Sequence, residues 1–209
     1  AKRFGVRREA PLWIPDARCV DCRSKAALRS ALQGATRRTL AAVRIRLLDI
    51  DDAEAFHELR LRGLAESPDP FLVTHAEDAA VSMEYVRGRF PRGGEAFALG
   101  AFDDDGRLVG IVGFSREQRR KVNHRGDVWG MYVAPEARGT GAGRALMDEL
   151  VRRCRELEGL EQVVLEVATG AVAACRLYEA VGFETIGVHC ESMKDGERYL
   201  DTRYMVLRM

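Results

Sequence analysis

From residue 43 onward, the chain follows two regular patterns of apolar and polar positions. Residues 43–48 place Val, Ile and Leu at alternate positions with Arg44 and Arg46 between them, which is the period of a strand with one solvated face. Residues 52–66 repeat apolar side chains at helical spacing instead. Similar patterns predict strands at 43–48, 96–102, 108–116, 127–133, 162–168, 183–191 and 199–208, and helices at 52–66, 77–89 and 172–181, with a further helix ending near 158.

Turn residues mark the boundaries between these segments. Asp105-Gly106 lies between two predicted strands, and Asp-Gly favours a tight hairpin because glycine accepts a positive φ. Ser67-Pro68 ends the first predicted helix, since proline cannot continue it. The resulting order, β-α-α-β-β-β-α-β-α-β-β, predicts an α/β protein of the mixed α+β kind, with helices covering one sheet.

Charge divides the chain at the point where regular patterning begins. Residues 1–43 hold ten basic and three acidic residues, whereas residues 44–209 hold 23 basic and 29 acidic ones. This break predicts a basic N-terminal extension, 1–43, followed by one domain, 44–209. We interpret the extension as poorly ordered. A docked helix over 24–43, a nucleic-acid-binding arm and non-native upstream sequence are the alternatives.

Composition excludes several classes of protein. With 46% hydrophobic and 31% charged residues among 209, the chain has material for one sizeable core, and no stretch reaches the ~18–20 uncharged apolar residues of a membrane span. Five cysteines at irregular spacing are typical of reduced thiols in a cytoplasmic protein. Cys19 and Cys22 form one Cys-x-x-Cys pair, but a structural zinc site takes four ligands, so no metal is expected.

The most informative segment is a glycine-rich loop, residues 138–144, between a predicted buried strand and an amphipathic helix. The first N–H groups of a helix have no internal partner and attract anions, and glycines let a phosphate approach the backbone. The loop lacks the Gly-Lys-Ser/Thr ending of a Walker A loop and the G-x-G-x-x-G spacing of a dinucleotide site. It therefore predicts a phosphate site of another kind, with a ligand-free turn as the alternative.

Two motifs here resemble the GNAT superfamily of N-acetyltransferases. Residues 138–143, Arg-Gly-Thr-Gly-Ala-Gly, are similar to its R/Q-x-x-G-x-G/A pyrophosphate loop. Residues 174–183, Ala-Cys-Arg-Leu-Tyr-Glu-Ala-Val-Gly-Phe, are similar to its A-x-x-L-Y-x-x-x-G-F segment. The resemblance covers about 43–209. It departs at Ala171, where many relatives carry an asparagine that helps to hold the pantetheine arm.

The resemblance implies a fold and a cofactor site. The fold is a mostly antiparallel mixed sheet of about seven strands, flanked by about four helices and splayed into a V-shaped gap. The co-substrate is acetyl-CoA, with its pyrophosphate on the loop N–H groups and its pantetheine amides paired with the exposed strand edge like an added strand. The implied cofactor-binding residues are Met131, Tyr132, Val133, Arg138, Gly139, Thr140, Gly141, Ala142, Gly143 and Arg144.

The resemblance also places Tyr178 near the cofactor sulfur, as a general acid. A phenol has an ordinary pKa of about 10, so it holds a proton that the leaving thiolate can take. The alternative is an aromatic side chain that only packs, because Leu177 and Phe183 surround it in the sequence.

Asp127 is the candidate general base. Strand alternation predicts that it shares a face with Trp129, Met131 and Val133, close to the thioester. Three alternatives stay open. They are His124, Glu166 and a chain of water molecules.

The implied activity is acetyl transfer to a primary amine of a small molecule or a protein N-terminus, by direct attack in a ternary complex. The acceptor pocket is implied to come from 52–90, 117–125 and 193–199. Amino acids, polyamines, antibiotics and protein N-termini all stay open as acceptors. A non-catalytic acetyl-CoA sensor or interaction module is the competing class. A net charge of +1 does not favour nucleic-acid binding, and a homodimer stays open.

Overall fold

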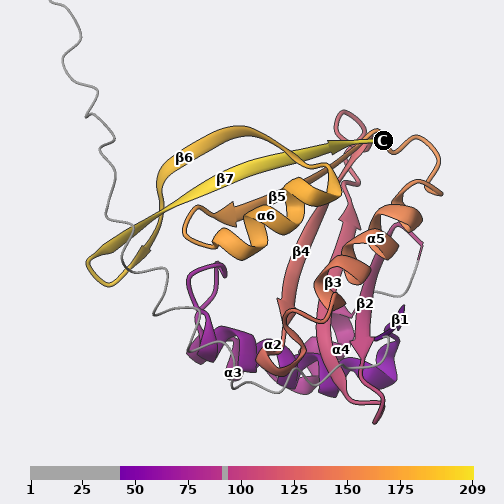
Figure 1. Ribbon diagram of the computed structural model, residues 1–209, viewed down its shortest axis with the longest axis vertical. Helices are drawn as coiled ribbons and strands as arrows, with labels where there is room; N and C mark the ends of the chain where they lie inside the picture. The colour runs from indigo at the N-terminus through magenta and orange to yellow at the C-terminus, as the bar shows by residue number, and fades with distance from the viewer. Residues whose placement is uncertain (1–42, 91–93) are drawn as a thin grey trace, which may run out of the picture. The chain divides into compact units, whose positions relative to one another are not determined.

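The computed structural model describes residues 43–90 and 94–209 (Figure 1). The predicted extension, with its Cys19 and Cys22 pair, lies outside the described residues up to position 42. The strands are β1 (Arg44–Leu47), β2 (Ala96–Phe102), β3 (Leu108–Arg116), β4 (Arg125–Val133), β5 (Gln162–Ala168), β6 (Glu184–Asp195) and β7 (Arg198–Arg208). The helices are α2 (Ala53–Glu66), α3 (His75–Ala79), α4 (Met83–Arg89), α5 (Ala142–Cys154) and α6 (Val172–Val181), with 3₁₀ helices η1 (Ile50–Asp52) and η2 (Pro135–Ala137).

The seven strands form one sheet in the order β1-β2-β3-β4-β5-β7-β6. All neighbouring strands are antiparallel except β4 and β5, which run parallel. The mixed, mostly antiparallel sheet of about seven strands is therefore confirmed. Gly106, in the turn between β2 and β3, has a φ of +76°, as the hairpin signal predicted.

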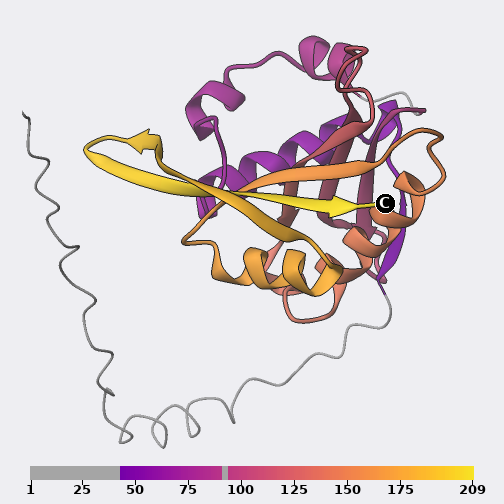
Figure 2. The ribbon, with the colours of Figure 1, turned by 90° about the horizontal axis from the view of Figure 1, so that it is seen from above.

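Helices cover both faces of the sheet. Figure 2 shows α2 and the short helices α3 and α4 on one side of the strands, with α5 and α6 on the other. The core lies between these layers, where apolar side chains of both helix layers meet the sheet. Its fully buried members include Leu99, Ile111, Phe114, Leu146, Leu150 and Met205.

The segment predicted as one helix over 77–89 forms two short helices. Thr74 caps α3 by accepting from the Glu77 N–H group, and Ser82 caps α4 by accepting from the Tyr85 N–H group. Each hydroxyl starts a new helix because it satisfies an N–H group that has no partner inside the helix. The described residues consequently hold five α-helices rather than about four.

A β-bulge interrupts β4. Tyr132 pairs with Ile111, and Trp129 pairs with Gly113, so two residues of β4 stand opposite one residue of β3. Gly130, at this bulge, has a φ of +65°, which glycine adopts at little cost. The bulge shifts the alternation of β4 by one residue.

The predicted alternation along β4 is therefore wrong beyond Trp129. The Trp129 ring lies 6.2 Å from the Phe56 ring of α2. Met131 and Val133 instead approach α5, with Met131 Cε 3.4 Å from the point where a Cβ on Gly143 would stand. Asp127 shares its face with Trp129, and not with Met131 and Val133.

Strands β4 and β5 pair over a short stretch and then part. Their register covers Arg125–Asp127 of β4 and Gln162–Val164 of β5, whereas β5 pairs with β7 along its whole length. The edge of β4 that faces β5 is consequently free of a strand partner from residue 128 onward. This free edge lies next to the gap that the splayed strands create.

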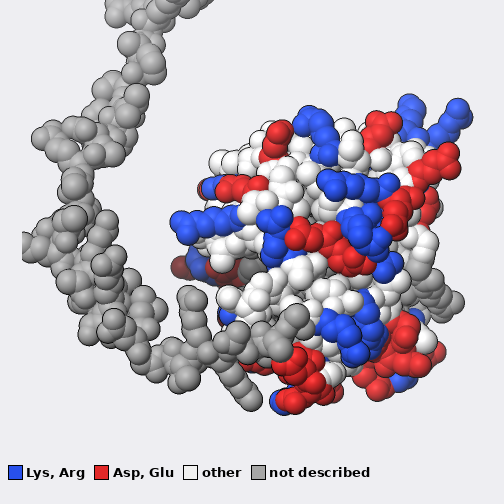
Figure 3. All heavy atoms as spheres, turned by 45° about the vertical axis from the view of Figure 1, so that its right-hand side comes forward, with Lys and Arg blue, Asp and Glu red and all other residues white. Residues whose placement is uncertain are grey.

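Charged side chains of both signs alternate on the exposed surface. On α5, Arg144 pairs with Asp148 and Arg153 pairs with Glu149, each four residues apart. Figure 3 shows Lys and Arg side chains interspersed with Asp and Glu over one face of the molecule. None of the helices within 43–90 and 94–209 has the length and apolar character needed to cross a bilayer.

Candidate active site

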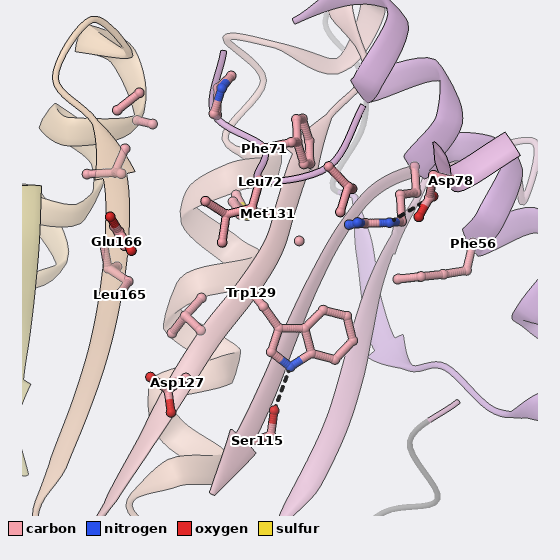
Figure 4. Close-up of a pocket in the computed structure, with 18 of the residues that line it drawn as sticks. Phe56, Phe71, Leu72, Asp78, Ser115, Asp127, Trp129, Met131, Leu165 and Glu166 are labelled. Atoms are coloured by element: carbon pink, nitrogen blue, oxygen red, sulfur yellow. Dashed lines mark hydrogen bonds and ion pairs between the residues drawn. The ribbon is translucent and has the colours of Figure 1, made fainter. Parts of the chain in front are cut away.

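A cavity of about 1010 Å³ opens where β4 and β5 part (Figure 4). One wall comes from α2, residues 70–73, α3 and α4, and the other comes from β4, β5 and α6. The predicted residues Asp127, Met131, Glu166 and Tyr178 all line it. The tertiary structure therefore brings together side chains from two strands and a helix that are far apart in the sequence.

The glycine loop presents unpaired N–H groups at the start of α5. Gly139 and Gly141 have φ values of +75° and +95°, and a Cβ on either would meet open space. Among the described residues, no protein acceptor takes the backbone N–H groups of 139–144, and the first helical bond runs from Ala145 N–H to Gly141 O. This cradle of donors, at the positive end of the helix dipole, fits a pyrophosphate.

Gly143 has a different role from the other two loop glycines. A Cβ there would lie 3.3 Å from Leu177 Cδ2 and 3.4 Å from Met131 Cε, so the glycine permits close packing of α5 against β4 and α6. Thr140 closes the loop locally, because its hydroxyl donates to Ala137 O at 2.7 Å.

The two arginines of the loop are held differently. Arg138 Nε donates to Val133 O at 2.9 Å, and its guanidinium lies 5.6 Å from the centre of the Tyr132 ring. Arg144 pairs with Asp148 and also donates to Ala180 O at 3.1 Å. Arg138 therefore lies beside the free edge of β4, whereas Arg144 ties α5 to the end of α6.

The predicted cofactor residues on β4 differ in where their side chains point. Tyr132 packs toward α2 and donates a 2.6 Å hydrogen bond to Glu66. Burial, with Glu66 as acceptor, raises the pKa of Tyr132 to about 12. Met131 and Val133 contact the α5 side. Beside this segment β4 has no strand partner on its β5 side, whereas Tyr132 pairs with Ile111 of β3 on the other side.

Tyr178 is almost fully buried, with 6% of its surface exposed, yet it lines the cavity. Burial, followed by the nearby Cys175 thiol, raises the pKa of its phenol, so the hydroxyl keeps its proton at neutral pH. The ring also packs against Phe183, with centroids 6.0 Å apart. Within the described part of the chain, its hydroxyl makes no hydrogen bond that the structure records.

The three candidate bases occupy different positions. Asp127 lies on the β4 side of the cavity, and partial desolvation, followed by the nearby Glu117, raises its pKa. Glu166 lies on β5 and accepts a short hydrogen bond from Thr202 Oγ1. His124 does not line the cavity, and its carbonyl accepts from Glu161 and Gln162. Asp127 and Glu166 are therefore the two acids on the strand side of the cavity, while Glu77 and Asp78 line its helix side (Figure 4).

The acceptor half of the cavity contains two residues that sequence analysis missed. His57 and Arg60 of α2 line it beside Asp78 of α3, while 117–125 contribute nothing to the lining. Arg60 Nε donates to Asp78 Oδ2 at 3.1 Å, and His57 Nδ1 lies 3.8 Å from the same oxygen. Polar residues of an amphipathic helix normally face solvent. In the sequence, the one indication that His57 and Arg60 could line a cavity is that they lie within about one helical turn of the apolar Phe56.

Comparison with known proteins places this fold and site in a family. Residues 56–183 match the Acetyltransferase (GNAT) family, and this chain belongs to that family. It is 33% identical over 116 residues to a mycothiol acetyltransferase of Propionibacterium freudenreichii. That match covers 54% of this chain and 36% of the relative, so the chain spans only about a third of that relative's length.

Solved structures show the same fold. An acetyltransferase of the GNAT family from Streptococcus pneumoniae superimposes with a TM-score of 0.73 at 22% identity, over 80% of this chain and 100% of that one. A GNAT superfamily phosphinothricin acetyltransferase from Sinorhizobium meliloti, solved in complex with acetyl-CoA, gives 0.67 at 24% identity, over 81% and 89%.

Proposed function

We propose that this protein transfers the acetyl group of acetyl-CoA to a primary amine by direct attack in a ternary complex. One arrangement carries the proposal. The free edge of β4 runs between the unpaired N–H groups of 139–144 and the cavity lined by Asp127 and Tyr178. A ligand with a pyrophosphate at one end, amides in the middle and a reactive group at the other end would place these three parts on the loop, on the β4 edge and in the cavity.

The loop and the strand edge would bind the cofactor and take no part in the chemical step. The N–H groups of 139–144 would hold the pyrophosphate, with Arg138 adding positive charge beside the edge. Along the segment Met131, Tyr132 and Val133, the backbone groups that face away from β3 would pair with the pantetheine amides. Ala171, at the start of α6, offers no side-chain amide for this purpose.

The reaction exchanges one bond for another. The neutral amine nitrogen forms a bond to the acetyl carbon, the carbon–sulfur bond breaks, and its electron pair leaves on sulfur. Asp127, directly or through water, would take the proton that the amine loses, and its raised pKa makes it a stronger base than an ordinary aspartate. The Tyr178 hydroxyl would give a proton to the sulfur.

The test measures turnover with a panel of amines. Purified protein, acetyl-CoA and one amine each from the amino acids, polyamines, aminoglycosides and short peptides should release coenzyme A. Mass spectrometry should find the matching acetylated amine. Tight acetyl-CoA binding with no turnover across the panel would favour the sensor alternative. No acetyl-CoA binding at all would contradict both functions.

A further inference from the structure

Arg60 projects a largely unused guanidinium into the cavity from α2. Its side chain is 21% exposed. Its Nε donates to Asp78, and among the described residues this is the one hydrogen bond that the guanidinium makes. Phe71 lies beside it, with 5.7 Å between the guanidinium carbon and the ring centre. The Nη1 and Nη2 groups therefore keep donors for a ligand.

These free donors lie next to the expected position of the reacting group. Nη1 of Arg60 is 3.7 Å from the point where a Cβ on Gly130 would stand, at the bulge of β4. Met131, the next residue, begins the edge assigned above to the pantetheine amides. Asp78, which is itself 17% exposed, fixes the guanidinium in this position through Nε.

The two walls of the cavity differ in the charged groups that they offer to a ligand. Asp127 and Glu166 lie on the β4 and β5 side, and Asp78 lies on the α3 side (Figure 4). Two acids also line the helix wall, but Asp78 accepts from Arg60 and Glu77 accepts from the N–H and hydroxyl groups of Thr74. The strand wall is therefore acidic, while Arg60 keeps free cationic donors on the helix wall. A zwitterion matches both walls, because its ammonium group faces the acids and its carboxylate faces the guanidinium. Arginine binds carboxylates well because its donors match the two oxygens.

Apart from His57, Arg60, Glu77 and Asp78, the helix wall is apolar and aromatic. Phe56 packs edge to face against Phe90, at 5.4 Å, and against Trp129, at 6.2 Å. Phe71 and Leu72, from the loop after α2, complete this surface. A substrate held by Arg60 would therefore place an apolar or aromatic side chain against these rings.

We propose that the acceptor is an amine with a carboxylate on the adjacent carbon, an α-amino acid with an apolar side chain, whose carboxylate is bound by Arg60. The inference rests on the proposed acetyl transfer and names the substrate class for it. It assigns Arg60 a role in acceptor specificity that is separate from cofactor binding.

The first experiment compares matched substrates on the unmodified protein. Phenylalanine is compared with phenethylamine, and leucine with isopentylamine, which differ only in the carboxylate. A hydrogen bond to a charged group contributes about 1.5–3 kcal/mol, so the amino acid should have a kcat/KM higher by about 10- to 150-fold. Equal or better turnover of the carboxylate-free amines would overturn this inference alone. Turnover of neither member of any pair, together with turnover of another amine of the panel, would also overturn this inference alone, whereas no turnover of any panel amine would overturn the proposed function as well.

The second experiment uses matched variants on one helix. Arg60→Gln should bring the phenylalanine-to-phenethylamine ratio of kcat/KM close to one, and Arg60→Lys should leave an intermediate ratio because it keeps charge but loses the fork. Arg62→Gln is the control, since Arg62 pairs with Glu66 and Glu136 outside this cavity, and it should keep the full ratio. Thermal unfolding checks that each variant is folded. An unchanged ratio in folded Arg60→Gln or Arg60→Lys would overturn the proposal.

Discussion

The hydroxyl of Tyr132 donates a 2.6 Å hydrogen bond to the carboxylate of Glu66, which joins β4 to the last residue of α2. The β4 bulge makes this contact, because it turns Tyr132 toward α2 while Met131 and Val133 face α5. The side chain of Tyr132 is therefore structural and faces α2, away from the α5 side.

Tyr132→Phe should lower the melting temperature at neutral pH and leave acetyl-CoA affinity unchanged. The hydrogen bond from Tyr132, together with Arg62, lowers the pKa of Glu66 below its ordinary 4.5. A depressed pKa gives stability that is present above the unfolded value and is lost as the pH falls through the folded one. The melting difference from the parent should therefore shrink below about pH 4.5. Tyr199→Phe, at a half-exposed ring, is the control, and a deficit that is independent of pH would contradict the assignment.

Gly141→Val should weaken acetyl-CoA binding by about 10- to 100-fold. A Cβ at Gly141 meets no protein atom, so the valine side chain would occupy space that the pyrophosphate is expected to fill. A lost hydrogen bond to a charged phosphate is worth about 1.5–3 kcal/mol. Calorimetry measures the affinity. Gly143→Val is a poorer test, because its side chain would collide with Leu177 and Met131.

Backbone strain needs its own control for the Gly141 experiment. Gly106 also has a positive φ, +76°, and open space where a Cβ would stand, but it lies in the β2–β3 turn. Gly106→Val should carry similar strain and keep full acetyl-CoA affinity. Equal affinities of folded Gly141→Val and Gly106→Val would remove the basis for placing the pyrophosphate on this loop.

Asp127→Asn should lower kcat by about 10²–10⁴-fold, the usual loss when a positioned base is removed, without a matching loss of acetyl-CoA affinity. The amide keeps the shape of the side chain and cannot accept the proton. Glu166→Gln, at the acid that lines the cavity from β5, should have the smaller effect. The reverse order would assign the base to Glu166, and two variants with parental kcat would point to water.

Tyr178→Phe removes one hydroxyl and keeps the packing against Phe183. Loss of the proton donor should lower kcat by about 10²–10⁴-fold, or roughly 3–5 kcal/mol of barrier, with little change in acetyl-CoA affinity. Steady-state kinetics with an identified acceptor measures it. A kcat within about threefold of the parent, far less than such a loss, would leave Tyr178 as a packing residue.

A chain of residues 44–209 should fold and bind acetyl-CoA as the full chain does. The charge break near 43 and the start of β1 at Arg44 motivate this boundary. Thermal unfolding and calorimetry of both chains test it. A large fall in melting temperature on truncation would show that the extension contributes to the folded core.

Local patterns determined most of the fold. The strands at 96–102, 108–116 and 162–168 and the helix at 172–181 have the predicted bounds, because alternation and helical periodicity report which face each segment buries. The glycine loop was also readable from the sequence, since its chemistry is carried by contiguous backbone at the start of a helix.

Long-range contacts decided the rest. The bulge at Gly130 depends on how β4 pairs with β3, so strand alternation alone put Asp127 on the same face as Met131. Arg60 and His57 of α2 were not singled out from the sequence, because their place in the cavity beside Asp78 of α3 depends on how the helices pack. The parting of β4 from β5, which opens the cavity, is visible only in the strand pairing, where β5 pairs with β7 along its whole length and with β4 over three residues. A sequence pattern records whether a side chain is buried, but tertiary packing alone fixes which side chains meet.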